Sequence, residues 1–181
     1  MKHLFEINDE IFVMKNMLRK GWLIRNVKSK TGRVESVAEH CFSTCMLALE
    51  IINKEKRDID QLKVLKMILY HEIGEIDVGD ITPHDNIPLE EKHNRELEGV
   101  KRISKAYNMP EILELWLEYE EQKTEEAKFV KMVDKLDAVI QSKIYSRLEE
   151  KESDIVDEFA KNAVDAFPEA EKYVEYIKNK K

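Results

Sequence analysis

Glycine, proline and cysteine are all scarce in this chain, which has 5, 4 and 2 of them among 181 residues. So few turn-forming residues, beside abundant leucine, glutamate and lysine, favour an all-α fold. The two cysteines, Cys41 and Cys45, are four residues apart and therefore lie on one face of a helix. We interpret them as core thiols, with metal ligation as the alternative.

The chain also lacks a long apolar run and an excess of basic residues. No stretch approaches the roughly 20 apolar residues that cross a bilayer, and Glu6 and Asp9 stand where a signal peptide would be apolar. We therefore expect a cytoplasmic protein with no membrane partner. The net charge of −7 argues against nucleic acid as a partner. Small anionic substrates are compatible with it, because a metal ion can supply local positive charge.

The apolar periodicity predicts eight helices, no strand and a single domain over residues 1–181. Ser36 and Glu39 have the spacing of a capping box and begin the second helix. We expect the last two helices to be peripheral because they are highly charged. The other expected helices span about residues 3–19, 61–74, 88–107, 110 onward, 124–148, 153–166 and 168–179, with a loop over 78–88.

The densest group of candidate metal ligands follows an apolar stretch at residues 64–70. His71 and Glu72 come directly after this stretch, and Glu75 and Asp80 follow closely. Imidazole nitrogens and carboxylate oxygens are the groups that divalent transition metals bind. The end of a buried helix is therefore predicted to present metal ligands, although an acidic run is also typical of a solvated helix end.

Candidate partners for this cluster occur on two other predicted helices. His40 lies one turn into the second helix, where a histidine is often merely structural. Asp134 has apolar residues one turn before and after it, so it projects from an apolar stripe. An inward carboxylate needs a cation, which Lys135, an arginine or a metal ion could supply. Three helices thus offer ligands, and Glu75, four residues after His71, is placed to act as an acid or base beside them.

This order of residues resembles the HD-domain phosphohydrolase superfamily, whose metal ligands follow the order His, His-Asp, Asp across an all-α bundle. Four longer motifs occur in order along the chain: GWLIRNV (21–27), ESVAEH (35–40), HEIGEIDVGDITP (71–83) and KMVDKLD (131–137). They resemble the 5′-deoxynucleotidase branch of this superfamily, and the likeness covers about residues 18–148. The segment DNIPLEEKH at 85–93 is similar to the subgroup of HD-domain-containing protein 2.

The resemblance implies a role for each matching residue and a reaction. Glu75 would position or activate the attacking water, and Asp80 would contact the substrate or orient the leaving group. Arg25 would bind the phosphate, and Trp22 would pack beside the nucleoside. The implied protein is a homodimer that hydrolyses deoxynucleoside 5′-monophosphates to nucleoside and phosphate. One divalent ion, with Mn, Co, Mg or Zn as candidates, would be held by His40, His71, Glu72 and Asp134.

Glu72 departs from the family pattern, which has aspartate at this position. The extra methylene moves the carboxylate about 1–1.5 Å farther from the backbone. Three alternatives to the implied function stay open. The chain could be a weakened HD protein that binds a nucleotide or a protein partner. It could act on another nucleotide, such as a cyclic nucleotide or a triphosphate. The least favoured alternative is a zinc peptidase, with Glu72 as general base and Glu75 in place of the second histidine of His-Glu-x-x-His.

Overall fold

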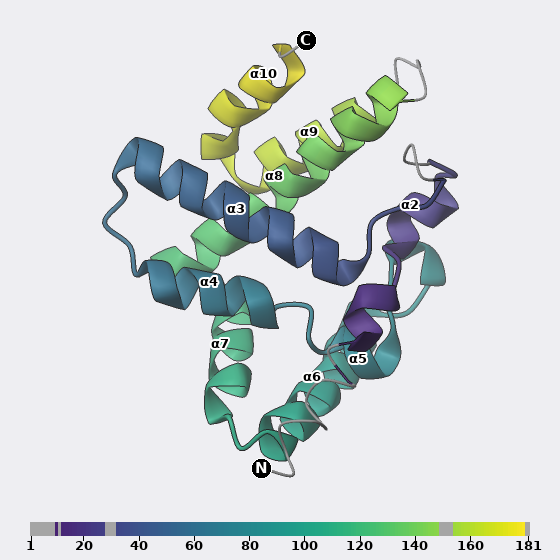
Figure 1. The fold of residues 1–181 in the computed structure, drawn as a ribbon, viewed down its shortest axis with the longest axis vertical. Coiled ribbons are helices and arrows are strands. Elements are labelled where there is room, and N and C mark those ends of the chain that lie inside the picture. Colours follow the sequence, from purple (N-terminus) through teal and green to yellow (C-terminus); the bar gives the residue numbers. More distant parts are fainter. Residues whose placement is uncertain (1–9, 11, 28–31, 149–153, 180–181) are drawn as a thin grey trace.

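The computed structural model describes residues 10, 12–27, 32–148 and 154–179, and every regular element longer than a single bridge within them is a helix (Figure 1). The predicted all-α class is therefore confirmed. Residues 12–16 are helical, and a single antiparallel bridge joins Leu18 to Ser36. The named α-helices are α2 (Lys20–Ile24), α3 (Val37–Glu55), α4 (Gln61–Tyr70), α5 (Glu75–Val78), α6 (Leu89–Ala106), α7 (Pro110–Glu121), α8 (Glu125–Leu148), α9 (Asp154–Ala166) and α10 (Glu171–Asn179).

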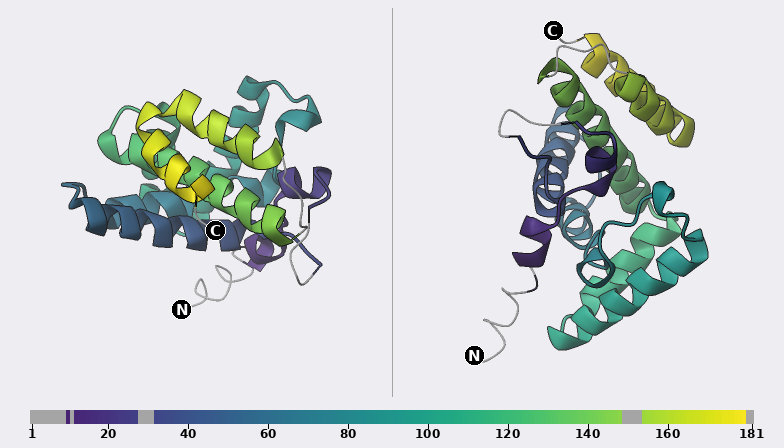
Figure 2. Two further views of the ribbon diagram at one scale, coloured as in Figure 1. Left: turned by 90° about the horizontal axis from the view of Figure 1, so that it is seen from above. Right: turned by 90° about the vertical axis from the view of Figure 1, so that its right-hand side faces the viewer.

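Helix α8 is the centre of the bundle. It contacts α3, α4, α7, α9 and α10, and the right-hand view of Figure 2 shows it between α3 and the C-terminal helices. Its buried positions recur around much of its circumference and include Val130, Val133 and Leu136. These residues share one core with Met67 and Ile68 of α4. Within the described residues, no helix combines the length and the apolar character needed to cross a bilayer.

The N-terminal helix differs from the prediction of about 3–19. Residues 3–9 lie outside the described residues, and residues 17–19 are not helical. Gly21 does not end a helix, because the short α2 (Lys20–Ile24) runs through it. The carboxylate of Asp80 accepts a hydrogen bond from the Lys20 backbone N–H at 2.6 Å. This contact from a distant segment satisfies an N–H at the start of α2, which local periodicity could not predict.

The helix expected over 61–74 ends at Tyr70, and a turn over 71–74 separates it from α5. Gly74 lies in this turn against α6, where an added Cβ would be 2.9 Å from both the Cβ and the carbonyl oxygen of Glu96. Gly99 makes the reciprocal approach, since a Cβ there would be 3.1 Å from the carbonyl oxygen of Gly74. Two glycines therefore let α6 pack directly on the turn that carries the candidate ligands.

The C-terminal helices are not peripheral. Ala160 and Ala163 of α9 and Val174 of α10 belong to the main core. Their charged residues face outward while small apolar residues pack against the bundle. The expectation that highly charged helices are peripheral was therefore wrong. Cys41 is buried and Cys45 half-buried on α3, and both are free thiols, as predicted.

Candidate metal centre and its cavity

Four predicted ligands from three parts of the chain converge in one cluster. His40 comes from α3, His71 and Glu72 from the end of α4, and Asp134 from α8. One ligand atom from each of the four residues lies within 4.8 Å of all the others. Glu75 is not in this group, so the geometry does not match a peptidase site in which Glu75 would be a ligand.

His40 is held in place by the start of α3 and by a buried carboxylate. The Ser36–Glu39 capping box is present as predicted and begins the helix one turn before the histidine. The imidazole is fully buried, and its Nδ1 is 2.8 Å from Asp137 Oδ2. This contact assigns the proton to Nδ1 and turns Nε2 toward the cluster, where it lies 3.2 Å from Asp134 Oδ1.

The protonation of His40 is set by opposing effects. Burial and the charge of Arg19 lower the pKa of the imidazole, but the carboxylates of Asp134 and Asp137 outweigh them and raise it to about 9. Without a metal ion, the protonated His40 imidazole therefore supplies the positive charge that offsets the carboxylates of Asp134 and Asp137. Binding of a metal through Nε2 requires this proton to leave.

His71 is oriented by the last turn of α4. Its Nδ1 donates to the carbonyl oxygen of Ile68 at 2.6 Å, so Nε2 again faces the cluster. The residue is 4% exposed, and burial lowers the pKa of the imidazole despite the nearby charges of Glu72 and Asp134. A buried, neutral imidazole with Nε2 unprotonated is the form that binds a metal ion.

The donor set fits a divalent ion. Among the described residues, the buried side-chain atoms without a hydrogen-bond partner are Nε2 of His40, Nε2 of His71 and Oε2 of Glu75. Buried polar atoms are costly when unpaired, and these two nitrogens lie beside carboxylate oxygens of Glu72 and Asp134. Two imidazoles and two carboxylates are a common ligand set for zinc and other transition metals.

Positive groups surround the two ligand carboxylates. Arg19 Nη1 donates to Glu72 Oε1 at 3.0 Å. Burial raises the pKa of Glu72, but the charges of His71 and Arg19 hold it below its usual value. Asp134 accepts a hydrogen bond from Tyr119 Oη at 3.3 Å. The lysine near it is Lys131, 4.0 Å away, and not Lys135, which was one of the candidate cations.

The two predicted catalytic carboxylates, Glu75 and Asp80, line one cavity with the ligand residues His71, Glu72 and Asp134. Glu75 is 2% exposed, and burial, with the negative charges of Glu72 and Asp80, raises its pKa well above the usual value. The helix expected over residues 61–74 does not continue to Glu75, because α4 ends before His71, so His71 and Glu75 do not lie on one helix. The separate helix α5 brings Glu75 back to the cavity instead.

The cavity has a volume of about 810 Å³ and opens onto the ligand cluster. Its positively charged residues are Arg19, Arg25, Lys92, Lys131 and Lys135, and they share it with several carboxylates. A volume of this size is typical of small-molecule sites. Mixed charge around a metal centre suits a phosphate carried on a polar organic group.

Trp22 and Arg25, the predicted substrate-binding residues, both line the cavity. Trp22 is only 3% exposed, its indole N–H donates to Glu35 Oε1 at 2.7 Å, and its ring packs on Tyr145 and Phe159. Trp22 is therefore part of the packed cavity wall, and little of its ring is open for a nucleoside to stack on. Arg25 donates to Glu158 Oε1 at 2.6 Å, so a phosphate would have to compete with this carboxylate.

Several residues at the site had no local signal in the sequence. Arg19, Lys92 and Phe159 reach the cavity from segments whose positions depend on the tertiary fold. Asp137 had a signal, since it ends the KMVDKLD motif, and it pairs with His40. Asp77 belongs to the HEIGEIDVGDITP motif, but its carboxylate binds Arg102 on the surface. His84 is exposed and lies at the cavity wall.

Comparison with known proteins places this geometry in a family. A family model described as "HD domain" matches residues 13–172. The 5′-deoxynucleotidase HDDC2 of Mus musculus is 39% identical over 76% of this chain and 67% of its own length. The human protein of the same name is 40% identical over 76% of this chain and 66% of its own.

A solved structure gives the same result for the fold. The chain of a "conserved hypothetical protein from Pyrococcus furiosus" superposes with a TM-score of 0.74 and 25% identity, covering 97% of this chain and 99% of that one. This chain spans about two thirds of the length of its mammalian relatives. It belongs to the HD-domain family, in the branch that contains the 5′-deoxynucleotidase HDDC2 proteins.

Proposed function

We propose that this protein is a metal-dependent phosphohydrolase that converts deoxynucleoside 5′-monophosphates to deoxynucleosides and phosphate. The observation that carries the proposal is the convergence of four ligand atoms within 4.8 Å beside a cavity that also contains cationic side chains. The relatives named 5′-deoxynucleotidase support this choice of substrate. His40, His71, Glu72 and Asp134 hold one divalent ion, for which Mn, Co, Mg and Zn are the candidates.

When bound, the ion acts as a Lewis acid toward the phosphoryl group and makes water easier to deprotonate. Glu75 lines the cavity with an unpaired buried oxygen, and it takes the proton of the attacking water. A carboxyl with a raised pKa is also suited to return a proton to the leaving 5′ oxygen.

The remaining cavity residues bind and orient the substrate. Arg25 and Lys131 supply positive charge for the phosphoryl oxygens, and a guanidinium can bind two of them at once. Asp80 has one carboxylate oxygen engaged by the Lys20 N–H, which fixes its position beside Glu75 for contact with substrate or leaving group. Trp22 and Phe159 form the apolar part of the wall, against which the nucleoside packs.

The test is phosphate release from a panel of ribo- and deoxynucleoside 5′-monophosphates. Each substrate is assayed with Mn²⁺, Co²⁺, Mg²⁺, Zn²⁺ or EDTA. We expect metal-dependent release with a preference for deoxy substrates. Cyclic nucleotides and triphosphates in the same panel separate the proposed reaction from that of an HD protein with another nucleotide substrate. Absence of release with every metal, from folded protein, would remove the proposed substrate class.

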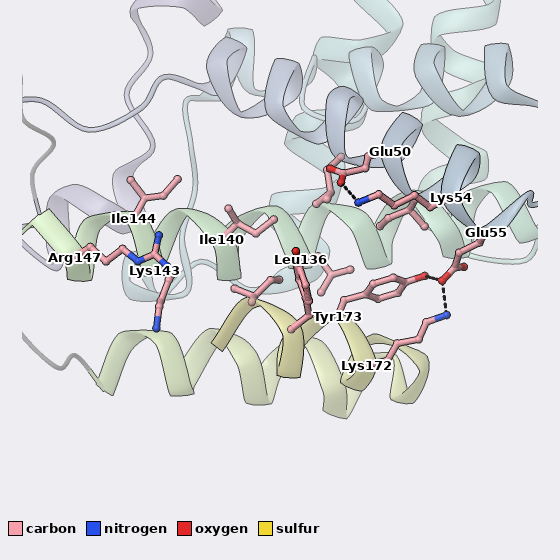
Figure 3. Close-up of a pocket in the computed structure, with 14 residues that line it drawn as sticks. Glu50, Lys54, Glu55, Leu136, Ile140, Lys143, Ile144, Arg147, Lys172 and Tyr173 are labelled. Carbon is pink, nitrogen blue, oxygen red and sulfur yellow. Dashed lines mark hydrogen bonds and ion pairs between the residues drawn. The ribbon is translucent and has the colours of Figure 1, made fainter. Parts of the chain in front are cut away.

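We further propose that the protein is a homodimer. An apolar groove of about 620 Å³ lies between α3, α8 and α10, away from the metal centre (Figure 3). Ile144 is 42% exposed at this groove, a large exposure for an isoleucine. Lys143 and Arg147 lie at one end of the groove, and at the other end Glu50 and Glu55 are paired with Lys54 and Lys172. The apolar surface between the two ends is what a second copy would cover across a two-fold axis.

Light scattering of Ile144→Glu tests this assembly, with Leu62→Glu as the control. Leu62 is 62% exposed on α4 and does not line the groove. We expect a dimer for the unmodified protein and for the control, and a monomer for Ile144→Glu. A monomeric unmodified protein would contradict the proposal.

We also propose one HD domain over the whole chain and a cytoplasmic location. The first rests on α9 and α10, which share the main core with α3, α4 and α8. The second rests on the composition, with two cysteines that are both free thiols in the structure. Limited proteolysis tests the first proposal, and cell fractionation tests the second.

A further inference from the structure

Glu72 poses a geometric problem for the proposed metal centre. A glutamate at this position reaches about 1–1.5 Å farther than the aspartate of the family pattern. A tuned site needs its ligands within about 0.5 Å of the productive geometry. An additional side-chain torsion also leaves the carboxylate freer to leave the ion. A second residue that restrains Glu72 would remove both difficulties.

Arg19 makes the contact that such a restraint requires. Its Nη1 donates to Glu72 Oε1 at 3.0 Å, and the same oxygen lies 3.4 Å from His71 Nε2. The side chains of Arg19 and Glu72 are each 18% exposed, so the pair is largely shielded from water. A charge-assisted bond in this setting is stronger than one on the surface.

The backbone at Arg19 is itself anchored. Its N–H donates to the carbonyl oxygen of Glu35 at 2.9 Å, beside the bridge between Leu18 and Ser36. The next N–H, that of Lys20, donates to Asp80. Two segments that also carry site residues therefore fix the backbone from which the guanidinium extends. Arg19 is placed by the fold and is not a long surface side chain that meets Glu72 by chance.

We propose that Arg19 is a positioning residue for Glu72, holding the longer carboxylate at the distance from the imidazoles that metal binding needs. The inference rests on the proposed metal site. It gives Arg19 a role through Glu72 and requires no contact with the substrate. Groups that hold a ligating carboxylate typically contribute 10–100-fold to metal affinity.

The direction in which metal affinity changes on loss of the Arg19 side chain separates a positioning role from a purely electrostatic one. Arg19 carries a positive charge beside a site for a cation. Removing that charge should, by Coulomb's law alone, raise the affinity for a divalent ion. Loss of a positioning contact should lower it. The two expectations are opposite, so one binding measurement decides between them.

The experiment is calorimetric titration of metal-free protein with Mn²⁺, which needs no turnover. We expect Arg19→Met to bind roughly 10–100-fold more weakly than the unmodified protein. Arg25→Met is the matched control, because Arg25 lines the same cavity but pairs with Glu158 and not with a ligand. Its Mn²⁺ affinity should match that of the unmodified protein. Circular dichroism and melting of the metal-free proteins establish that each variant folds.

A double-mutant cycle with Glu72→Asp tests the pairing itself. The shorter aspartate does not reach Arg19, so adding Arg19→Met to Glu72→Asp should change Mn²⁺ affinity little. Equal losses in the two backgrounds would overturn the proposal, as would an unchanged or higher affinity in Arg19→Met alone. If Arg19→Met fails to fold, Arg19→Lys is measured instead. Lysine keeps the positive charge but lacks the planar guanidinium, so we expect Mn²⁺ to bind several-fold more weakly.

The outcomes also distinguish this inference from the proposed function. Normal Mn²⁺ binding and turnover in Arg19→Met would overturn the positioning role and leave the phosphohydrolase proposal intact. Failure of the unmodified, folded protein to bind any divalent ion would overturn the metal site, and both proposals with it.

Discussion

Single hydrogen bonds decide which nitrogen each histidine presents to the ligand cluster. The Nδ1 atoms of His40 and His71 are taken by Asp137 and by the carbonyl oxygen of Ile68, so both residues present Nε2. At Glu75 an unpaired buried oxygen and a raised pKa mark a carboxyl that is suited to proton transfer. The chemistry thus depends on orientation and burial as much as on residue type.

Glu75→Gln keeps the size of the side chain but removes its ability to accept a proton. We expect kcat to fall by about 10²–10⁴-fold, the usual contribution of a general acid or base. Mn²⁺ affinity should change little, because Glu75 is not one of the four clustered ligands. Phosphate release and calorimetry on the same preparation measure the two effects. Retained turnover would rule out proton transfer by Glu75.

Asp137→Asn weakens the hydrogen bond that orients His40. The carboxylate of Asp137 accepts from Nδ1 at 2.8 Å, and this partner raises the basicity of the imidazole. We expect Mn²⁺ affinity to fall about 10–100-fold. Asp77→Asn is the control, since that carboxylate pairs with Arg102 on the surface and should leave affinity unchanged. Equal affinities in the two variants would contradict the assigned role of Asp137.

At the level of elements, the site depends on where helices begin and end. The Ser36–Glu39 capping box places His40 one turn into α3. Helix α4 ends at Tyr70, which frees His71 and Glu72 to turn toward the cluster. The turn that follows packs on α6 through Gly74 and Gly99.

Gly74→Ala tests this close approach between the turn and α6. A Cβ at 2.9 Å from the backbone of Glu96 forces the helix and the turn apart, at a cost of about 1–3 kcal/mol. For a chain of 181 residues, each kcal/mol lowers Tm by about 2–4 °C. Gly21→Ala is the control, because its nearest neighbour would be a side-chain atom at an ordinary 3.8 Å. Thermal melting should show a loss for Gly74→Ala alone.

At the level of the whole molecule, α8 unites the core and the candidate metal centre. This helix packs against α3, α4 and α9, and Asp134 and Asp137 lie on it. The clustered ligands come from α3, the end of α4 and α8, which are distant in sequence. An ion bound there would link these three elements and stabilise the folded state only.

Addition of Mn²⁺ should therefore raise Tm. At a free concentration near 100 times Kd the stabilisation is about 2.7 kcal/mol, or roughly 5–11 °C for a protein of this size. EDTA should reverse the shift. Asp134→Asn should reduce it strongly because one ligand loses its charge. A Tm that does not depend on metal would argue against an ion shared by the three helices.

Much of this protein could be inferred from the sequence because its signals are local. Helical periodicity, the capping box at Ser36 and proline at the start of α7 depend on neighbouring residues. The order of the motifs that contain His40, His71, Glu72 and Asp134 was enough to identify the candidate ligands. Helix ends were less predictable, as Tyr70 illustrates, because contacts with other segments decide them.

The sequence by itself determined the all-α class, the family and the candidate ligands, because residue type and spacing carry that information. The tertiary structure decided which nitrogen of each histidine faces the ligand cluster and that Asp137 pairs with His40. It also brought Arg19 to Glu72 across 53 positions of sequence and made α9 part of the cavity wall. These contacts join residues that are far apart in the chain, and packing of the whole bundle is what brings them together.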